Sequence, residues 1–227
     1  MIGNDLRITD RLYELLLERA AQHVKELATA GDAGETGGSS GAFKKNLKVV
    51  EEDLHRTFGE LGHFRKGNPL YQPLKNVLLA YSLLRPDLGY VQGMSYVAGL
   101  ILLHCEGQEK TAFKCFANLM NRELLFTFYS FEMERVNVIF HVFMTLMRDR
   151  LPKLYANFKQ TNISCSIFLF EWIVALYSNI FALETSARLW DQYLYHGDYF
   201  LVRVAIAICL CLESQLTNSQ SAGQSVP

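Results

Sequence analysis

The chain has 227 residues, of which 50% are hydrophobic, so it can bury a sizeable core in one domain or two small ones. Charged residues make up 20% and the formal net charge is −1, which gives no overall attraction to nucleic acid or to an anionic membrane. We therefore expect neither nucleic acid nor a directly bound membrane surface among its partners.

The cysteines and histidines argue against a disulfide framework and against a metal site. Five cysteines, an odd number, include no Cys-x-x-Cys pair, and the six histidines are scattered. The first residues mix polar and apolar types, so no signal peptide is visible. The longest apolar runs, 96–103 and 204–212, are too short to span a bilayer. These features predict a cytoplasmic protein with reduced thiols, no metal and no transmembrane segment.

Helical spacing governs the first third of the chain. Thr9 is placed to cap a helix that ends by Ala30. Residues 31–41 are rich in glycine and serine and are expected to form a flexible loop. A second helix is expected from Ala42, because apolar residues recur every three or four positions up to Phe58. Pro73 suits the first turn of a third helix that runs to about Leu84.

The rest of the chain continues the helical pattern, and no stretch alternates like a strand. Further helices are expected at 94–103, 109–121, 133–150, 154–158, 167–177, 185–195 and 199–213. Residues 214–227 are polar and aperiodic, so they are expected to form a disordered tail after a domain over 1–213. The predicted class is all-α, with roughly ten helices.

Between the third and fourth expected helices, residues 87–96 form an irregular stretch with two glycines and one amide side chain. Gly89 and Gly93 lack a Cβ atom and so allow a tight turn. Such a turn can hold Gln92 at the edge of a helical scaffold. A loop amide often bonds only to nearby backbone, but an amide that both donates and accepts can also orient a water molecule.

The second expected helix carries Asp53 and Arg56 three positions apart, which lets the carboxylate pair with the guanidinium. On most helices such a pair is a weak, solvated ion pair. It can also aim an arginine at phosphate oxygens, and an arginine together with a glutamine would assist phosphoryl transfer. The sequence has no P-loop and no kinase signature, so any nucleotide would have to arrive on a partner.

Several motifs in order resemble one known family. Val50-Glu51-Glu52-Asp53-Leu54-His55-Arg56 resembles the Ile-x-x-Asp-x-x-Arg motif of the TBC-domain family of Rab GTPase-activating proteins, and Tyr90-Val91-Gln92-Gly93 matches its Tyr-x-Gln-Gly motif. Arg188-Leu189-Trp190-Asp191, followed by residues 200–205, is similar to a later block of that family. Ile2-Gly3-Asn4 resembles a segment near its start.

The resemblance implies an all-α TBC-type domain with a groove that takes a Rab-family small GTPase in its GTP form. It implies that Arg56 is an arginine finger on the phosphates and that Gln92 is a glutamine finger replacing the GTPase's own glutamine. Asp53 would support Arg56, while Tyr90 and Gly93 would shape the loop that presents Gln92. No cofactor of the chain's own is expected. Membrane contact would be indirect, through the Rab, and peripheral on endomembranes.

Two alternatives stay open beside this reading. A non-catalytic helical module could bind Rab proteins as a scaffold, and binding without faster phosphate release would identify it. A self-contained enzyme has less support, because local motifs show no nucleophile–base set. Compared with the family, the C-terminal lobe is expected to be truncated, since a polar tail follows Glu213.

Overall fold

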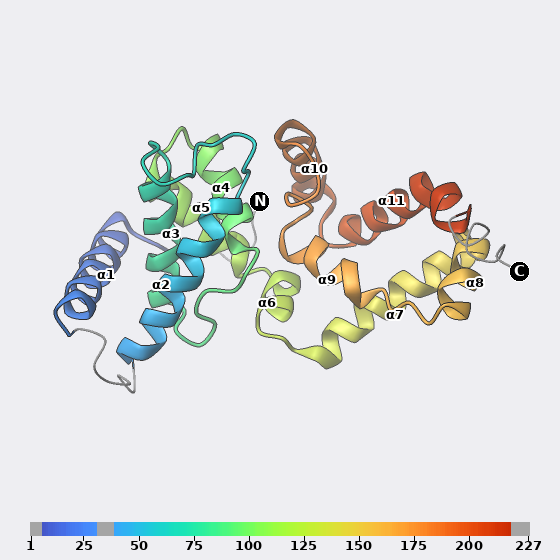
Figure 1. Cartoon of the computed structure of the whole chain (residues 1–227), viewed down its shortest axis with the longest axis horizontal. Helices are drawn as coiled ribbons and strands as arrows, with labels where there is room; N and C mark the ends of the chain where they lie inside the picture. The colour runs from blue at the N-terminus through green and yellow to red at the C-terminus, as the bar shows by residue number, and fades with distance from the viewer. Residues whose placement is uncertain (1–5, 31–38, 219–227) are drawn as a thin grey trace, which may run out of the picture.

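The computed structural model describes residues 6–30 and 39–218, and every regular element in these ranges is a helix (Figure 1). The all-α prediction is confirmed, with eleven helices in the described part. They are α1 (Asp10–Ala30), α2 (Ser39–Arg56), α3 (Tyr71–Leu84), α4 (Met94–His104), α5 (Glu109–Met120), α6 (Glu123–Tyr129), α7 (Met133–Arg150), α8 (Pro152–Gln160), α9 (Ser166–Val174), α10 (Leu183–His196) and α11 (Tyr199–Asn218).

The helices form two groups along the chain. Helices α1–α5, the N-terminal half, pack against one another, and helices α6–α11, the C-terminal half, do the same. Helices α5 and α6 are neighbours across the boundary. Figure 1 shows the two halves side by side along the long axis of the molecule. Segments that connect helices in one half can therefore face helices of the other half.

Helix α4 is a central element of the N-terminal half because it has almost no polar face. Its buried residues include Met94, Val97, Leu100 and Leu102, and it packs against α2, α3 and α5. Full burial of one such side chain stabilises a fold by about 1.5–3 kcal/mol. The first turn of α4 is therefore a firmly held support for the segment that precedes it.

Several predicted helix boundaries are confirmed. The Oγ1 of Thr9 accepts a hydrogen bond from the backbone N–H of Leu12 at 3.2 Å, as expected of an N-cap. Helix α7 covers the predicted range 133–150, and α4 begins at the predicted Met94. Pro152 is the first residue of α8, where its missing N–H costs no helical bond.

Other boundaries were predicted wrongly. Helix α2 begins at Ser39, so residues 39–41 are helical and not part of a loop. Helix α6 was not predicted. Helix α9 ends at Val174, because Leu176 and Tyr177 adopt positive φ angles of 46° and 62°. The remaining expectations for residues 31–38, for the tail beyond 218 and for the Ile2-Gly3-Asn4 segment lie outside the described residues.

Helix α11 is longer than predicted and reaches Asn218, so residues 214–218 are helical. By length and composition alone, Tyr199–Thr217 could cross a membrane, although buried helices of other proteins meet the same criterion. Here α11 packs against α7, α8, α9 and α10. Its Leu210, Leu212 and Leu216 remain exposed.

Candidate functional site

The connection between α3 and α4 is a turn held from both sides. Gly89 has a φ of +65°, and a Cβ atom there would lie 3.0 Å from the Oδ1 of Asn46 on α2. The same oxygen accepts a hydrogen bond from the N–H of Tyr90 at 3.2 Å. Gly93 has a φ of +101°, and its Cβ would lie 3.2 Å from the Cγ2 of Val174 on α9. Glycine is thus required at both positions for two reasons, the positive φ angle and the lack of space for a Cβ atom.

Arg56 is the last residue of α2, and a buried carboxylate directs its side chain. One Nη atom of Arg56 donates to the Oδ1 of Asp53, whose side chain is 1% exposed, while the Arg56 side chain is 51% exposed. The second carboxylate oxygen of Asp53 accepts a hydrogen bond from the hydroxyl of Tyr90 at 2.6 Å. A guanidinium fixed on one edge and open on the other can bind a further anion.

Tyr90 links this ion pair to the turn that carries Gln92. Burial, followed by the nearby Asp53 carboxylate, raises the pKa of Tyr90 well above its ordinary value. The phenol therefore stays protonated and keeps donating to Asp53 at neutral pH. The predicted role of Tyr90 was only to shape the loop, whereas its hydroxyl also contacts the partner of Arg56.

Arg56 and Gln92 lie on one groove of about 380 Å³ between the two halves. Gln92 is exposed, and the neighbouring Gly93 is buried against α9. The sequence-based expectation that these two side chains open onto a common surface agrees with this geometry. The other lining residues are Val91, Tyr96, Phe131, Phe170, Glu171, Val174, Ala175 and Asn179.

The far wall of the groove was missed at the sequence level. The rings of Phe131 and Phe170 stack with centroids 5.6 Å apart and an interplanar angle of 16°. Phe131 is 53% exposed and adopts a φ of +55°, which is unusual for a bulky side chain. The buried Oδ1 of Asn179 has no hydrogen-bond partner among the described residues, and Asn179 lines the same groove. No local motif marks these positions, because they join the site only through the packing of α6 and α9.

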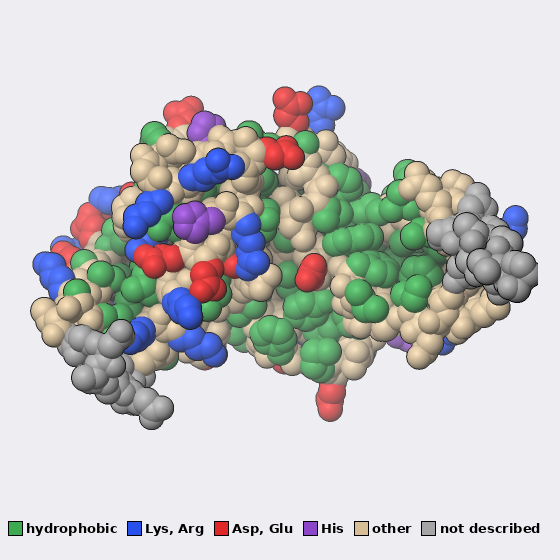
Figure 2. Space-filling model, in the orientation of Figure 1, with side chains coloured by type: hydrophobic (Ala, Val, Ile, Leu, Met, Phe, Trp, Pro, Cys, Tyr) green, Lys and Arg blue, Asp and Glu red, His purple; other side chains and the backbone are tan. Residues whose placement is uncertain are grey.

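The molecular surface also differs between the halves. In Figure 2, charged side chains gather over the N-terminal half, whereas hydrophobic side chains dominate the middle and the C-terminal half in this view. Phe131, which lines the groove, is one of the exposed hydrophobic residues. Exposed apolar surface of this kind commonly marks contact with another macromolecule.

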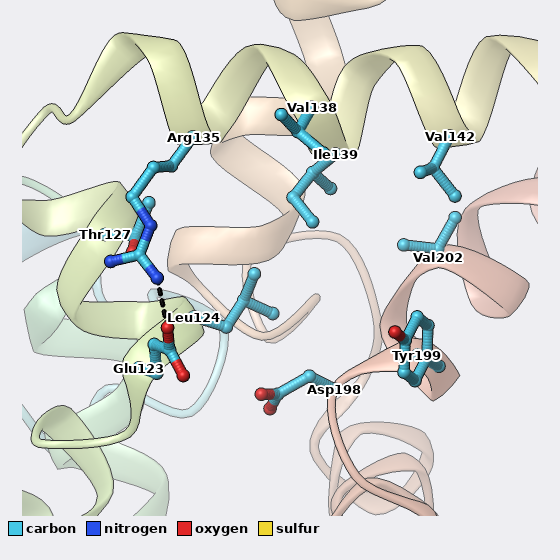
Figure 3. Close-up of a pocket in the computed structure, with 10 residues that line it drawn as sticks. All are labelled: Glu123, Leu124, Thr127, Arg135, Val138, Ile139, Val142, Asp198, Tyr199 and Val202. Atoms are coloured by element: carbon cyan, nitrogen blue, oxygen red, sulfur yellow. Dashed lines mark hydrogen bonds and ion pairs between the residues drawn. The ribbon is translucent and has the colours of Figure 1, made fainter.

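A second cavity, of about 360 Å³, lies between α6, α7 and the start of α11 (Figure 3). Its walls are formed by Leu124, Ile139 and Val202, and its rim carries Asp198 and an ion pair between Arg135 and Glu123. None of the residues predicted to act in a site lies here. The two Nη atoms of Arg135 are already engaged by carboxylates, one by Glu123 and the other by Glu132.

The chemistry available in the groove is anion binding and water orientation. Within residues 6–30 and 39–218, no group of three or more His, Cys, Asp or Glu side chains could hold a metal ion. The guanidinium of Arg56 suits phosphate oxygens, and the amide of Gln92 can donate to one atom and accept from another. The wide mouth and apolar wall suit a protein surface better than an enclosed small molecule.

A family model and similar known proteins point to the same family. The family model of the Rab-GTPase-TBC domain matches residues 10–217. TBC1 domain family member 14 of Homo sapiens is 36% identical over 219 residues, which cover 95% of this chain and 31% of that protein. TBC1 domain family member 12 of Mus musculus is 36% identical over 216 residues, with coverages of 95% and 31%. The chain thus spans under a third of the length of these relatives.

A more distant relative and a solved structure agree with this grouping. Drainin of Dictyostelium discoideum is 27% identical over 241 residues, which cover 91% of this chain and 55% of that protein. The crystal structure of the Chlamydomonas flagellar RabGAP TBC domain matches with a TM-score of 0.58 and 24% identity, covering 92% of this chain and 69% of that one. At this level of identity the structural match shows a shared fold.

Proposed function

The chain belongs to the Rab-GTPase-TBC domain family, and from this premise we propose that it stimulates GTP hydrolysis by a Rab-family small GTPase. The observation that carries the proposal is the placement of Arg56 and Gln92 on one open groove between the two halves. The GTPase, in its GTP-bound form, would occupy this groove and bring both the nucleotide and its magnesium. The chain itself would supply no cofactor.

Arg56 is the proposed arginine finger. Phosphoryl transfer spreads negative charge over the transferring group, and an arginine supplied by a partner stabilises this charge. Asp53 and Tyr90 hold the guanidinium at the rim of the groove, so little side-chain freedom is lost when it meets the phosphates. Helix α2 ends at Arg56, which places the side chain at the edge of the fold.

Gln92 is the proposed glutamine finger. Its amide oxygen can accept a hydrogen bond from the attacking water while its NH2 group donates to a phosphate oxygen, which places the nucleophile in line. Gly93 permits the backbone turn that leaves Gln92 exposed while its neighbour packs on Val174. The products would be GDP and phosphate on the GTPase. We further propose that the protein is cytoplasmic and reaches endomembranes only through the Rab.

A single-turnover assay on a panel of GTP-loaded Rab proteins tests the proposal. We expect the wild-type chain to accelerate phosphate release from at least one Rab. Arg56→Ala should reduce the stimulated rate about 10³-fold or more, because an arginine finger contributes about 10³–10⁵ to GTPase rates. Gln92→Ala should reduce it about 10²-fold, as expected for one lost preorganised donor.

Arg135→Ala is the matched control. Arg135 is 52% exposed and pairs with the carboxylates of Glu123 and Glu132, whereas Arg56 pairs with that of Asp53, and Arg135 lies on the other cavity. Its loss should leave the stimulated rate unchanged. Binding of a Rab loaded with a non-hydrolysable GTP analogue should survive in all three variants. Binding by the wild type without faster phosphate release would instead identify a scaffold, and an Arg56→Ala variant at the wild-type rate would exclude the finger role.

A further inference from the structure

A buried row of hydroxyl groups lies directly beneath the proposed finger residues. Thr57 follows Arg56 at the end of α2, and Ser95 lies in the first turn of α4, just after the Gln92 turn. The side-chain oxygens of Thr57 and Ser95 are 2.8 Å apart. Thr57 is 1% exposed and Ser95 is fully buried, so water does not compete for this contact.

The Thr57 hydroxyl has a second neighbour on its own helix. The Thr57 hydroxyl also lies 2.8 Å from the carbonyl oxygen of Asp53. That carbonyl already accepts the backbone N–H of Thr57 at 3.0 Å, as in a regular helix. A carbonyl oxygen has two lone pairs, so it can accept both groups of Thr57, and the Ser95 hydroxyl can either donate to Thr57 or accept from it.

Ser95 connects the pair to the groups described above. Ser95 lies close enough to Tyr90 to lower the pKa of that phenol, against the larger effect of burial, and the Tyr90 hydroxyl donates to Asp53 at 2.6 Å. The row thus runs from Thr57 through Ser95 and Tyr90 to the carboxylate that holds Arg56. Hydrogen bonds in such a chain polarise and strengthen one another in a dry interior.

Backbone and packing contacts join the same two helix ends. The hydroxyl of Tyr96 donates to the carbonyl oxygen of Arg56 at 3.1 Å. One turn further along α4, a Cβ atom on Gly99 would lie 3.3 Å from the Cγ2 of Thr57. Glycine at this position therefore lets α4 approach α2 closely enough for Thr57 to reach Ser95.

We propose that Thr57 and Ser95 are positioning residues that hold the helix end carrying Arg56 in register with the turn carrying Gln92. This inference rests on the proposed function. Neither hydroxyl lines the groove, so neither touches the GTPase or its nucleotide. Their contribution is to the distance between the two finger residues, and misplacement by about 1 Å can cost about 10²-fold in rate.

Two substitutions at Thr57 separate the effect of losing the hydroxyl group from the effect of changing the side-chain shape. Thr57→Val keeps the branched shape and removes the hydroxyl, whereas Thr57→Ser keeps the hydroxyl and removes the methyl group that packs on Gly99. We expect Thr57→Val to lower the kcat of stimulated hydrolysis about tenfold with KM within twofold of wild type. We expect Thr57→Ser to restore kcat to within about twofold, even where its melting temperature is lower than that of Thr57→Val.

Ser95→Ala should lower kcat as Thr57→Val does, and the double variant should be no worse than either single one, because the two hydroxyls act as a unit. Ser82→Ala is the control for loss of a buried hydroxyl. Ser82 is 3% exposed and donates to the carbonyl oxygen of Leu79 at 2.8 Å, within α3 and outside the groove. The Ser82→Ala variant should leave kcat unchanged.

The measurement is phosphate release from the Rab that the wild-type chain activates most, combined with thermal unfolding of each variant. The positioning role would be overturned if kcat across the variants fell with melting temperature and not with loss of the hydroxyl. It would also be overturned if Thr57→Val kept the wild-type kcat. Either result would leave the proposed function standing. A wild-type chain that activates no Rab would overturn both.

Discussion

At the scale of single residues, Gly93 meets two separate demands. Its φ of +101° is unfavourable for residues with a Cβ atom, and its Cβ would press on Val174 at 3.2 Å. Gly67 has a similar φ of +93°, but within residues 6–30 and 39–218 no atom lies within 4 Å of the position that its Cβ would take. The two glycines therefore separate the cost of backbone conformation from the cost of contact with α9.

Gly67→Ala should lower the free energy of unfolding by about 1–2 kcal/mol, the cost of a left-handed residue, with stimulated hydrolysis unchanged. Gly93→Ala should lower it further and also reduce kcat at least tenfold, because the turn must shift away from Val174 and carry Gln92 with it. Urea unfolding and single-turnover hydrolysis measure the two effects. Equal kcat values for the two variants would contradict a special role for the turn at Gly93.

Among single residues, the candidate site is only partly predictable from the sequence. Asp53, Arg56, Tyr90, Gln92 and Gly93 stand in two short motifs, so the resemblance to the motifs of a known family picks them out. The row of hydroxyl groups at Thr57 and Ser95 cannot be predicted from the sequence in this way, since serine and threonine are common in buried and exposed positions alike. Only the approach of α4 to α2 shows that Thr57 and Ser95 meet.

At the scale of elements, the connection between α6 and α7 forms the far wall of the groove. Phe131 holds a φ of +55° there with half of its surface exposed, which costs stability without filling the core. Such strain is often retained at binding sites. We interpret the Phe131 ring, stacked on Phe170, as part of the surface that meets the GTPase.

Phe131→Gly should leave the free energy of unfolding within about 1 kcal/mol of wild type, since relief of backbone strain offsets the lost aromatic pair. It should raise KM severalfold with little change in kcat, because the lost contact is made equally before and during the reaction. Steady-state hydrolysis over a range of GTP-loaded Rab concentrations checks this.

Glu106→Gly is the matched control for the relief of strain. Glu106 has a φ of +52° in the connection between α4 and α5 and does not line the groove. This change should alter stability slightly and leave KM unchanged. An unchanged KM for Phe131→Gly would remove Phe131 from the proposed docking surface.

Elements with a clear apolar and polar face are the ones that the sequence predicts well. Helices α1, α5 and α7 have this pattern, and their ranges were close to those observed. Helix α6 has only seven residues, and four of these are buried leucine or aromatic residues. It therefore has no polar face from which a helical period could be recognised. Helix α9 was predicted too long because its apolar sequence continues past the point where the backbone turns.

At the scale of the whole molecule, buried tyrosines spread through both halves make stability depend on pH. Burial raises the pKa of Tyr81 to about 12, and burial likewise raises the pKa of Tyr13, Tyr177 and Tyr193. In the unfolded chain a tyrosine ionises near pH 10. The folded state therefore holds protons that the unfolded state releases above this pH.

The stabilisation from these groups is therefore complete below about pH 10 and is lost as pH rises towards 12. Each of these tyrosines lowers the free energy of unfolding by up to about 1.4 kcal/mol per pH unit in this window. Melting temperatures at pH 8–11, with tyrosinate absorbance recorded in parallel, test this. We expect a steep fall above pH 10, made shallower by Tyr81→Phe. Tyrosinate absorbance from all tyrosines in a chain that remains folded would contradict it.

The division of the groove between the halves has a practical consequence for protein engineering. Arg56 and Gln92 both come from α1–α5 and the turn before α4, whereas Phe131, Phe170 and Val174 come from α6–α11. The guanidinium of Arg85 lies 4.9 Å from the ring of Phe126 and bridges the division. A cut between α5 and α6 would leave each fragment with half of the groove. Recovered hydrolysis would then report the reassembly of two chains, which makes this domain a candidate split reporter.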